Sequence, residues 1–180
     1  SKKRQIKENN SEENVINSFN HIVTVSEYIT KELKERYPNS TSIFHTIPNG
    51  FDDDDINLID KKVNDAKIKL IFAGTLYDSA IKYLETLIGL LFELKKDDIE
   101  LYNNIEIDIY GSVNLEIDYL PKIVNLWGNI SNKEINNKIT KADACLLFLS
   151  DDINYSFSTK FCEYVGRRKP ILVFSNDGPA

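Results

Sequence analysis

Short apolar segments recur along the chain and alternate with stretches of helical periodicity. Segments of five to seven residues predict the strands His21–Val25, Ile68–Gly74, Ile105–Gly111, Ile123–Gly128, Ala144–Ser150 and Pro170–Phe174. Several are apolar on both faces, as is typical of parallel strands buried on both sides. Ile81–Lys96 has the i, i+3, i+4, i+7 spacing of an amphipathic helix. Glu27–Arg36 and Asn132–Lys141 predict two further helices, which begin after the N-cap candidates Ser26 and Ser131.

The alternation of strands and helices predicts the fold class. It indicates βαβ units, so we expect an α/β protein with a Rossmann-like parallel sheet and helices on both faces. Between residues 37 and 67 the pattern weakens to one brief strand, Ile43–Ile47, a turn at Pro48–Gly50 and four consecutive aspartates. We place a domain boundary there, which divides the chain into residues 1–48 and 49–180.

Composition and charge narrow the classes of partner. With 180 residues, of which 42% are hydrophobic, the chain can bury a substantial core. A formal net charge of −6 argues against nucleic acid as a partner, and no apolar run reaches the roughly 18 residues that span a bilayer. Cys145 and Cys162 lack metal-ligand spacing, so we expect two buried thiols in a reducing cytoplasm. The first residues carry no secretory signal, and both ends lead us to expect a piece of a longer protein.

Ligands of open parallel sheets bind outside the carboxyl ends of the strands, so the turns after the strands hold the candidate sites. In the first of these turns, Gly74 and Thr75 come directly after a strand, and Lys82 lies near the start of the next helix. Backbone N–H groups and a cation in this arrangement favour a phosphate. The alternative is a glycine that serves the turn alone. Neither a GxGxxG pattern nor a P-loop is present.

A second candidate is the cluster of hydroxyl residues before the last predicted helix. Ser156, Ser158 and Thr159 lie at a helix N-terminus, where the helix dipole favours an anion, and Lys160 follows them. The alternative is ordinary capping by a single serine.

Glu163 lies inside the same helix and has two interpretations. It could form a surface ion pair with Arg167 at i+4. Alternatively, its carboxylate could accept hydrogen bonds from two vicinal hydroxyl groups of a ligand, such as those of a ribose. A capping box is excluded, because the residue three positions earlier is Lys160.

The remaining candidates are weaker. The turn at Asn129 and Ile130 could read a flat base through its backbone, whereas Trp127 beside it is expected to be a core residue. Asp52–Asp55 could be read as a metal-binding cluster, but we interpret it as a solvated linker because no buried strand fixes its geometry. Asp151 and Asp152 are interpreted as a polar loop, and His21 and His45 as structural residues.

Together these segments resemble the donor-binding half of a retaining glycosyltransferase of the GT-B fold, in the family 4-like group. HIVTVSEYITKELKERY resembles the last strand and helix of the acceptor domain, IPNGFD the crossing into the donor domain, and IFAGTL the glycine turn near the donor diphosphate. WGNISNKEI through ADACLLFLS is similar to the base-contacting turn with its helix and the next strand. TKFCEYVGRRKPILVF is similar to a segment written K-F-x-E-Y-x-x-x-x-K-P-I in many members.

The resemblance implies a role for each candidate residue. Glu163 matches the second glutamate of the family's E-x7-E motif, which contacts the donor ribose, whereas the first glutamate is replaced by Tyr155. Asn129 and Ile130 match the base-binding turn. The residues implied for the donor diphosphate are Gly74, Thr75, Lys82, Ser158, Thr159 and Lys160. No metal ion or cofactor is implied, and the sequence identifies no catalytic residue.

The implied substrate is a nucleoside diphosphate sugar, and the implied acceptor is a saccharide or a lipid-linked molecule. The composition, rich in Ile and Asn and with Lys well above Arg, indicates a bacterial source. The resemblance then implies polysaccharide assembly in the cytoplasm, at the inner face of the membrane. Because acceptor-side residues would lie outside this sequence, the chain itself is expected to bind donor and transfer little or nothing. Two alternatives stay open: a nucleotide-sugar epimerase of the same fold, and a non-catalytic α/β interaction module.

Overall fold

The computed structural model describes residues 11–52, 67–112, 120–149 and 158–176. These residues form two compact units, which are divided between Asn49 and Gly50. Each unit is described separately below. The assignment of the two units to an acceptor domain and a donor domain remains a prediction.

The first unit is a small βαβ arrangement. Strands β1 (His21–Thr24) and β2 (Ile43–Thr46) pair in parallel, and helix α2 (Glu27–Arg36) connects them. The predicted N-cap is confirmed, since the Ser26 hydroxyl accepts the N–H of Ile29 at 3.2 Å. Hydroxyl groups link the helix to both strands: Thr30 is 2.5 Å from Thr24 and 2.7 Å from Thr46 between their Oγ1 atoms.

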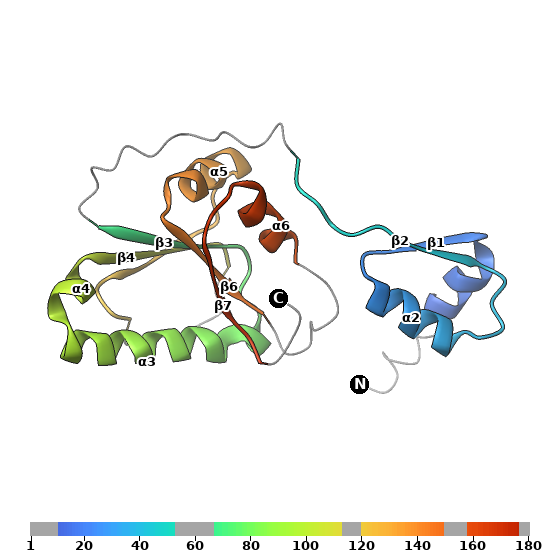
Figure 1. The fold of residues 1–180 in the computed structure, drawn as a ribbon, viewed down its shortest axis with the longest axis horizontal. Helices are drawn as coiled ribbons and strands as arrows, with labels where there is room; N and C mark the ends of the chain where they lie inside the picture. The colour runs from blue at the N-terminus through green and yellow to red at the C-terminus, as the bar shows by residue number, and fades with distance from the viewer. Residues whose placement is uncertain (1–10, 53–66, 113–119, 150–157, 177–180) are drawn as a thin grey trace. The chain divides into compact units, whose positions relative to one another are not determined.

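The second unit contains a five-stranded parallel sheet of order β5-β4-β3-β6-β7 (Figure 1). Its strands are β3 (Ile68–Ala73), β4 (Ile105–Tyr110), β5 (Val124–Gly128), β6 (Ala144–Phe148) and β7 (Ile171–Phe174). Its helical elements are the short η2 (Asp78–Ala80), α3 (Ile81–Asp97), α4 (Ile99–Asn103), α5 (Asn132–Lys141) and α6 (Thr159–Gly166). Helices α3 and α4 cover one face of the sheet, and α5 and α6 cover the other. The predicted α/β fold is therefore confirmed.

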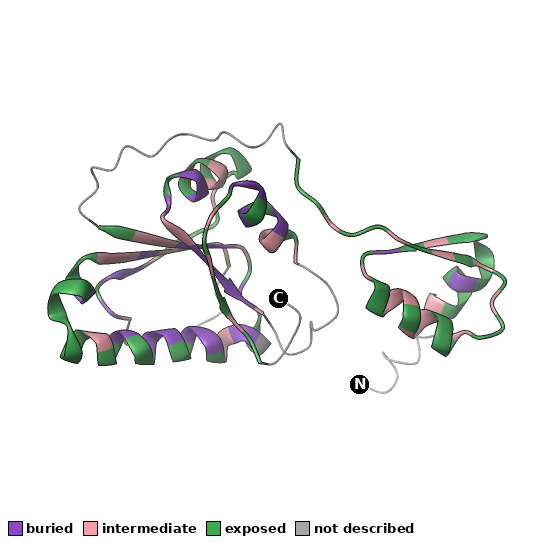
Figure 2. Ribbon diagram, in the orientation of Figure 1, coloured by how far each residue is buried: buried purple, intermediate pink, exposed green. Residues whose placement is uncertain are grey.

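Alternating residues of each strand supply the two hydrophobic cores. Buried residues recur along α3 (Figure 2). They belong to the core that α3 shares with the sheet, and they are Tyr83, Leu84, Leu87, Ile88 and Leu91. They pack against Phe72, Ile107, Ile109, Leu146 and Phe148. The core on the opposite face comprises Ile71, Ala73, Tyr110, Ile139, Ala142, Cys145 and Tyr164. The sheet is therefore buried on both faces, as its apolar strands predict.

The order of the strands reverses between β3 and β6. The ladder between β3 and β4 extends over the whole of β3, from Ile68 to Ala73. The ladder between β3 and β6 contains only the pairs Leu70–Ala144 and Ile71–Cys145. The two strands therefore separate toward their carboxyl ends, at the point where an open α/β sheet places its ligand crevice.

Lys169, the lysine of the K-P-I motif, has a structural role. The Lys169 ammonium donates to the carbonyl oxygens of Thr140 at 2.6 Å and Ala142 at 2.8 Å. These groups lie at the C-terminus of α5, where unpaired carbonyls and the helix dipole favour a cation. Lys169 thus fastens the start of β7 to the end of α5.

The prediction that Trp127 is a core residue was wrong. Its side chain is 55% exposed, and its indole N–H donates to the Asp108 carboxylate at 2.6 Å. The reason is its position near the carboxyl end of β5, which is an edge strand of the sheet. There the ring stacks against Tyr110, with 6.3 Å between ring centroids.

Both cysteines are buried free thiols, as predicted, and burial raises the pKa of Cys145 to about 12. His21 and His45 are exposed on neighbouring strands, and their Nδ1 and Nε2 atoms are 2.9 Å apart. Among the residues that the structure describes, no helix has the length and apolarity that crossing a membrane requires. The predictions for Asp53–Asp55, Asp151 and Asp152 lie outside the described residues.

Candidate functional site

A cavity of about 260 Å³ opens at the carboxyl ends of the strands in the second unit. Five residues predicted from the sequence line it: Gly74, Asn129, Ile130, Lys160 and Glu163. They come from the ends of β3 and β5 and from helix α6. The structure therefore brings together residues that lie up to about ninety positions apart in the chain.

Glycine at the ends of β3 and β4 lets the two strand ends approach closely. Gly74 and Gly111 have φ values of 134° and 115°, a region that other residues rarely adopt. A Cβ atom on Gly111 would collide with the carbonyl group of Gly74. The Gly74 N–H donates to the carbonyl of Tyr110 at 2.9 Å, and the Gly111 N–H to that of Gly128 at 2.7 Å. At the cavity floor, hydrogen bonds therefore join the ends of β3, β4 and β5.

These hydrogen bonds determine which N–H groups of the turn after β3 are available to a phosphate. The Gly74 N–H is already bonded to Tyr110, and the Leu76 N–H donates to the Ser112 carbonyl at 3.0 Å. Between them, the Thr75 N–H has no acceptor among the described residues. An anion at this turn would therefore meet the amide of Thr75 rather than that of Gly74.

Lys160 crosses directly over the Gly74 turn. A Cβ atom on Gly74 would collide with the Lys160 side chain and lie 2.7 Å from its Nζ. The ammonium lies 5.4 Å from the centroid of the Phe72 ring. Burial lowers the pKa of Lys160, and the nearby Glu163 carboxylate opposes this shift. The absence of a side chain on Gly74 thus allows a partly desolvated cation to occupy the mouth of the turn.

Glu163 carries an exposed carboxylate at the cavity. Both it and Arg167 are among the described residues, and no ion pair joins their side chains. Instead, Arg167 Nη1 donates to the backbone carbonyl of Glu163 at 3.0 Å, and the Arg167 side chain is buried. The ion-pair interpretation of Glu163 was therefore wrong, and its carboxylate remains directed to the cavity.

The hydroxyl residues predicted at the start of α6 have different positions in the structure. Ser158 is the N-cap of the helix, and its hydroxyl accepts the N–H of Phe161 at 3.1 Å, which confirms the capping alternative for this residue. Thr159 is exposed at the first helical position. Neither residue lines the cavity. Ser156 and Tyr155 lie outside the described residues.

Lys82 and the Thr75 side chain are not brought to the cavity. Lys82 lies in the first turn of α3, on the opposite face of the sheet from α6, and its ammonium is 4.9 Å from the centroid of the Tyr83 ring. Thr75 is exposed and does not line the cavity. The turn after β3 leads the chain to the α3 face, whereas the cavity lies on the face of α5 and α6.

The turn after β5 is held in place by its side chains. Asn129 Nδ2 donates to Ser112 Oγ at 3.2 Å, which ties this turn to the end of β4. Ser131 and Glu134 form a capping box at the start of α5, and the hydrogen bonds from Ser131 lower the pKa of Glu134. The backbone at Asn129 and Ile130 is therefore fixed at the cavity wall.

Five residues of the cavity were not singled out from the sequence: Ala73, Tyr110, Gly111, Asn132 and Ile135. Tyr110 and Gly111 line it at the end of β4. The signal that could have identified them is the register of the sheet, since Ala73 lies opposite Tyr110 across the ladder.

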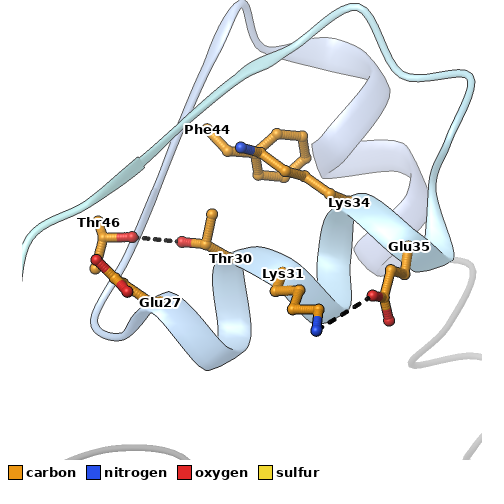
Figure 3. Close-up of a pocket in the computed structure, with 7 residues that line it drawn as sticks. All are labelled: Glu27, Thr30, Lys31, Lys34, Glu35, Phe44 and Thr46. Carbon is orange, nitrogen blue, oxygen red and sulfur yellow. Dashed lines mark hydrogen bonds and ion pairs between the residues drawn. The ribbon is translucent and has the colours of Figure 1, made fainter.

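A larger hollow of about 500 Å³ lies in the first unit, beside α2 and β2 (Figure 3). Thr30 and Thr46 on its wall are hydrogen-bonded to each other, and Lys31 pairs with Glu35 at 3.9 Å. The hollow has no glycine turn and does not lie at a switch in strand order. We therefore place the functional site at the smaller cavity.

Comparison with solved structures agrees with this architecture. The pneumococcal O-GlcNAc transferase GtfA, solved with UDP and GlcNAc, matches 89% of the chain with a TM-score of 0.60 and 17% identity. The GtfA/B complex matches 87% with a TM-score of 0.53 and 17% identity, and sucrose-phosphate synthase from Thermosynechococcus elongatus matches 90% with a TM-score of 0.58 and 16% identity. The chain shares the fold of GT-B glycosyltransferases.

The chain spans only part of each of these proteins. It covers 31% of GtfA, 30% of the chain matched in the GtfA/B complex and 42% of sucrose-phosphate synthase. The sequence itself matches no protein-family model and no curated protein at a significant level.

Proposed function

We propose that the cavity of the second unit binds the nucleoside diphosphate of a sugar donor. One observation carries the proposal: the Gly74 turn, the partly buried Lys160 and the Glu163 carboxylate meet in one cavity at the switch point of the sheet. A diphosphate needs a cation and backbone donors, and a ribose needs an acceptor for two hydroxyl groups. Lys160 supplies the cation and Glu163 the acceptor, and both line this cavity.

We propose the following roles for the lining residues. The Lys160 ammonium contacts the diphosphate beside the Gly74 turn. Glu163 accepts hydrogen bonds from the ribose hydroxyls. The base lies against the backbone of Asn129 and Ile130, which the capping box and the Asn129 side chain hold in position. The solved structure of GtfA with UDP supports a nucleotide in a protein of this fold.

For the full-length protein we propose a retaining glycosyltransferase of the family 4-like group, acting on a saccharide or lipid-linked acceptor. The proposed mechanism is independent of metal: Lys160 and the dipole of α6 stabilise the negative charge that grows on the departing diphosphate. The proposed location is the cytoplasm, at the inner face of the membrane. These statements depend on the resemblance of the sequence segments and on the shared fold.

The test is calorimetric titration of the chain with UDP, GDP and ADP. We expect saturable binding of at least one of them. Glu163→Gln should weaken that binding by at least about tenfold, because a charged acceptor of ribose hydroxyls contributes about 1.5–3 kcal/mol. Glu85→Gln, an exposed change on α3, is the matched control and should bind as the parent does.

Two outcomes would contradict the proposal. A folded chain that ignores all three nucleotides would favour the interaction-module alternative. Binding that is unchanged in Glu163→Gln would remove Glu163 from the site.

A further inference from the structure

Tyr164 fills the gap where β3 and β6 separate. Its side chain is fully buried, among the core residues shared by the sheet and helices α5 and α6. Its hydroxyl oxygen accepts the backbone N–H of Ala73 at 3.1 Å. Ala73 is the last residue of β3 and directly precedes Gly74. The phenol therefore contacts the strand end that leads into the cavity.

The direction of the backbone groups explains this contact. Along β3, the N–H groups of Ile68 and Gly74 point toward β4, where they bond to the carbonyls of Asn104 and Tyr110. The N–H groups of Lys69 and Ala73 point the other way, toward β6. The Lys69 N–H donates to the Asp143 carboxylate at 2.8 Å. The β6 ladder ends before Ala73, so the phenol replaces the missing strand carbonyl.

The same side chain belongs to the helix that carries the charged groups of the site. Tyr164 directly follows Glu163 and lies one helical turn after Lys160. Its hydrogen bond therefore joins the Gly74 turn to the element that presents both charges. Burial raises the pKa of Tyr164, so the phenol stays neutral and keeps its geometry over the whole physiological range.

We propose that Tyr164 is a positioning residue, whose hydroxyl sets the separation between the Gly74 turn and the side chains of Lys160 and Glu163. This inference rests on the proposed function of the cavity. Phenylalanine at this position keeps the ring and its packing but leaves the Ala73 N–H without an acceptor. The strand end and α6 are then free to move relative to each other.

The first readout needs no ligand. In Tyr164→Phe we expect the amide resonances of Ala73 and Gly74 to move in nitrogen–proton correlation spectra, and hydrogen exchange at Ala73 to accelerate about tenfold or more. Tyr102→Phe is the matched control. Tyr102 is a buried tyrosine on α4, at the amino end of β4, and the same substitution there should leave both amides unchanged.

The second readout is affinity for UDP, GDP or ADP, whichever the parent binds best, and for inorganic pyrophosphate. Tyr164→Phe should weaken both the nucleotide and pyrophosphate by about five- to tenfold. In a background that already carries Lys160→Met and Glu163→Gln, the same change should have less than about a twofold effect, since Tyr164 acts through these two side chains. A purely structural role would lower stability equally in both backgrounds and leave affinity unchanged.

The outcomes separate the two proposals. If the parent binds no nucleotide, the proposed function fails, and the amide spectra alone decide whether Tyr164 holds the turn. If the parent binds and Tyr164→Phe binds equally well, the positioning role is refuted while the proposed function stands. Unmoved Ala73 and Gly74 resonances would refute the positioning role in either case.

Discussion

Replacing Lys160 with methionine should change stability and nucleotide affinity in opposite directions. Methionine keeps an apolar stem over Gly74 and removes the ammonium group, together with its contact to the Phe72 ring. In the free protein, burial disfavours the charged form of this lysine, as the lowered pKa indicates. The substitution therefore removes an unfavourable group from the free protein and a favourable one from the complex.

The sign of the stability effect follows from the direction of the pKa shift. The unfolded chain titrates Lys160 near the ordinary value of 10.5, and the folded chain titrates it at a lower pH. Below the folded pKa the burial penalty is fully present, and it is relieved as the pH rises toward 10.5. We therefore expect Lys160→Met to unfold at a higher urea concentration than the parent at pH 7, with the difference shrinking in alkaline buffer.

The magnitude for binding follows from Coulomb's law. A lysine ammonium about 4 Å from a phosphate charge contributes about 4 kcal/mol at an effective dielectric constant of 20. The cavity is open to solvent and salt, so we expect roughly half of this, about 2 kcal/mol, or about a thirtyfold loss of affinity for the nucleotide. The parent's affinity should also fall, relative to the variant, as the pH rises through the lowered pKa of Lys160.

Calorimetry measures the nucleotide affinity and urea denaturation measures the stability, both on the same preparations. Lys96→Met, on the exposed end of α3, is the control. A variant that binds as tightly as the parent would remove Lys160 from the diphosphate site. A variant that is less stable than the parent at pH 7 would show that contacts such as the one with the Phe72 ring outweigh the burial cost of the ammonium in the free protein.

Two further predictions concern residues that hold the backbone around the site. Gly111→Ala should lower the free energy of unfolding by more than about 2 kcal/mol and weaken nucleotide binding, because its Cβ collides with the Gly74 carbonyl and its φ is positive. Gly128→Ala is the control: its φ is also positive but its Cβ meets open space, so urea denaturation should show a loss of only about 1 kcal/mol. Lys169→Met should lower the free energy of unfolding by about 2 kcal/mol, since it leaves two carbonyl groups at the end of α5 without their cation, whereas Lys141→Met on the same helix should have little effect. Equal effects within either pair would contradict the contact assigned to it.

The fold could be predicted from the sequence because its helices and strands carry local signals. Serine at positions 26 and 131 and the apolar spacing that follows each fix the starts of α2 and α5, and both helices have the predicted bounds. Trp127 was mispredicted because burial depends on where a strand lies in the sheet. An apolar residue near the carboxyl end of an edge strand is exposed, and no local pattern tells that β5 is an edge strand.

The candidate site could be predicted from the sequence only in part, because some of its residues carry a local signal and others do not. The rule that ligands lie at the carboxyl ends of parallel strands leads to Gly74, Asn129 and Glu163 without knowledge of the sheet order. Tyr110 and Tyr164 could not be found that way, because their positions depend on which strands are neighbours and where a ladder ends. Such pairings join residues far apart in the chain and leave no periodic signal.

The threonine contacts of the first unit affect how melting experiments are interpreted. Of its described hydrophobic side chains only Ile16 is buried, and hydroxyl contacts between α2 and the two strands take the place of an apolar interior. A hydrogen bond of this kind adds less net free energy than the burial of an apolar side chain does, so the first unit has less hydrophobic stabilisation of its own than the doubly covered sheet. The sole tryptophan, Trp127, lies in β5, so its fluorescence follows the unfolding of the sheet, whereas circular dichroism records both units; a lower midpoint by circular dichroism would show that the first unit melts first.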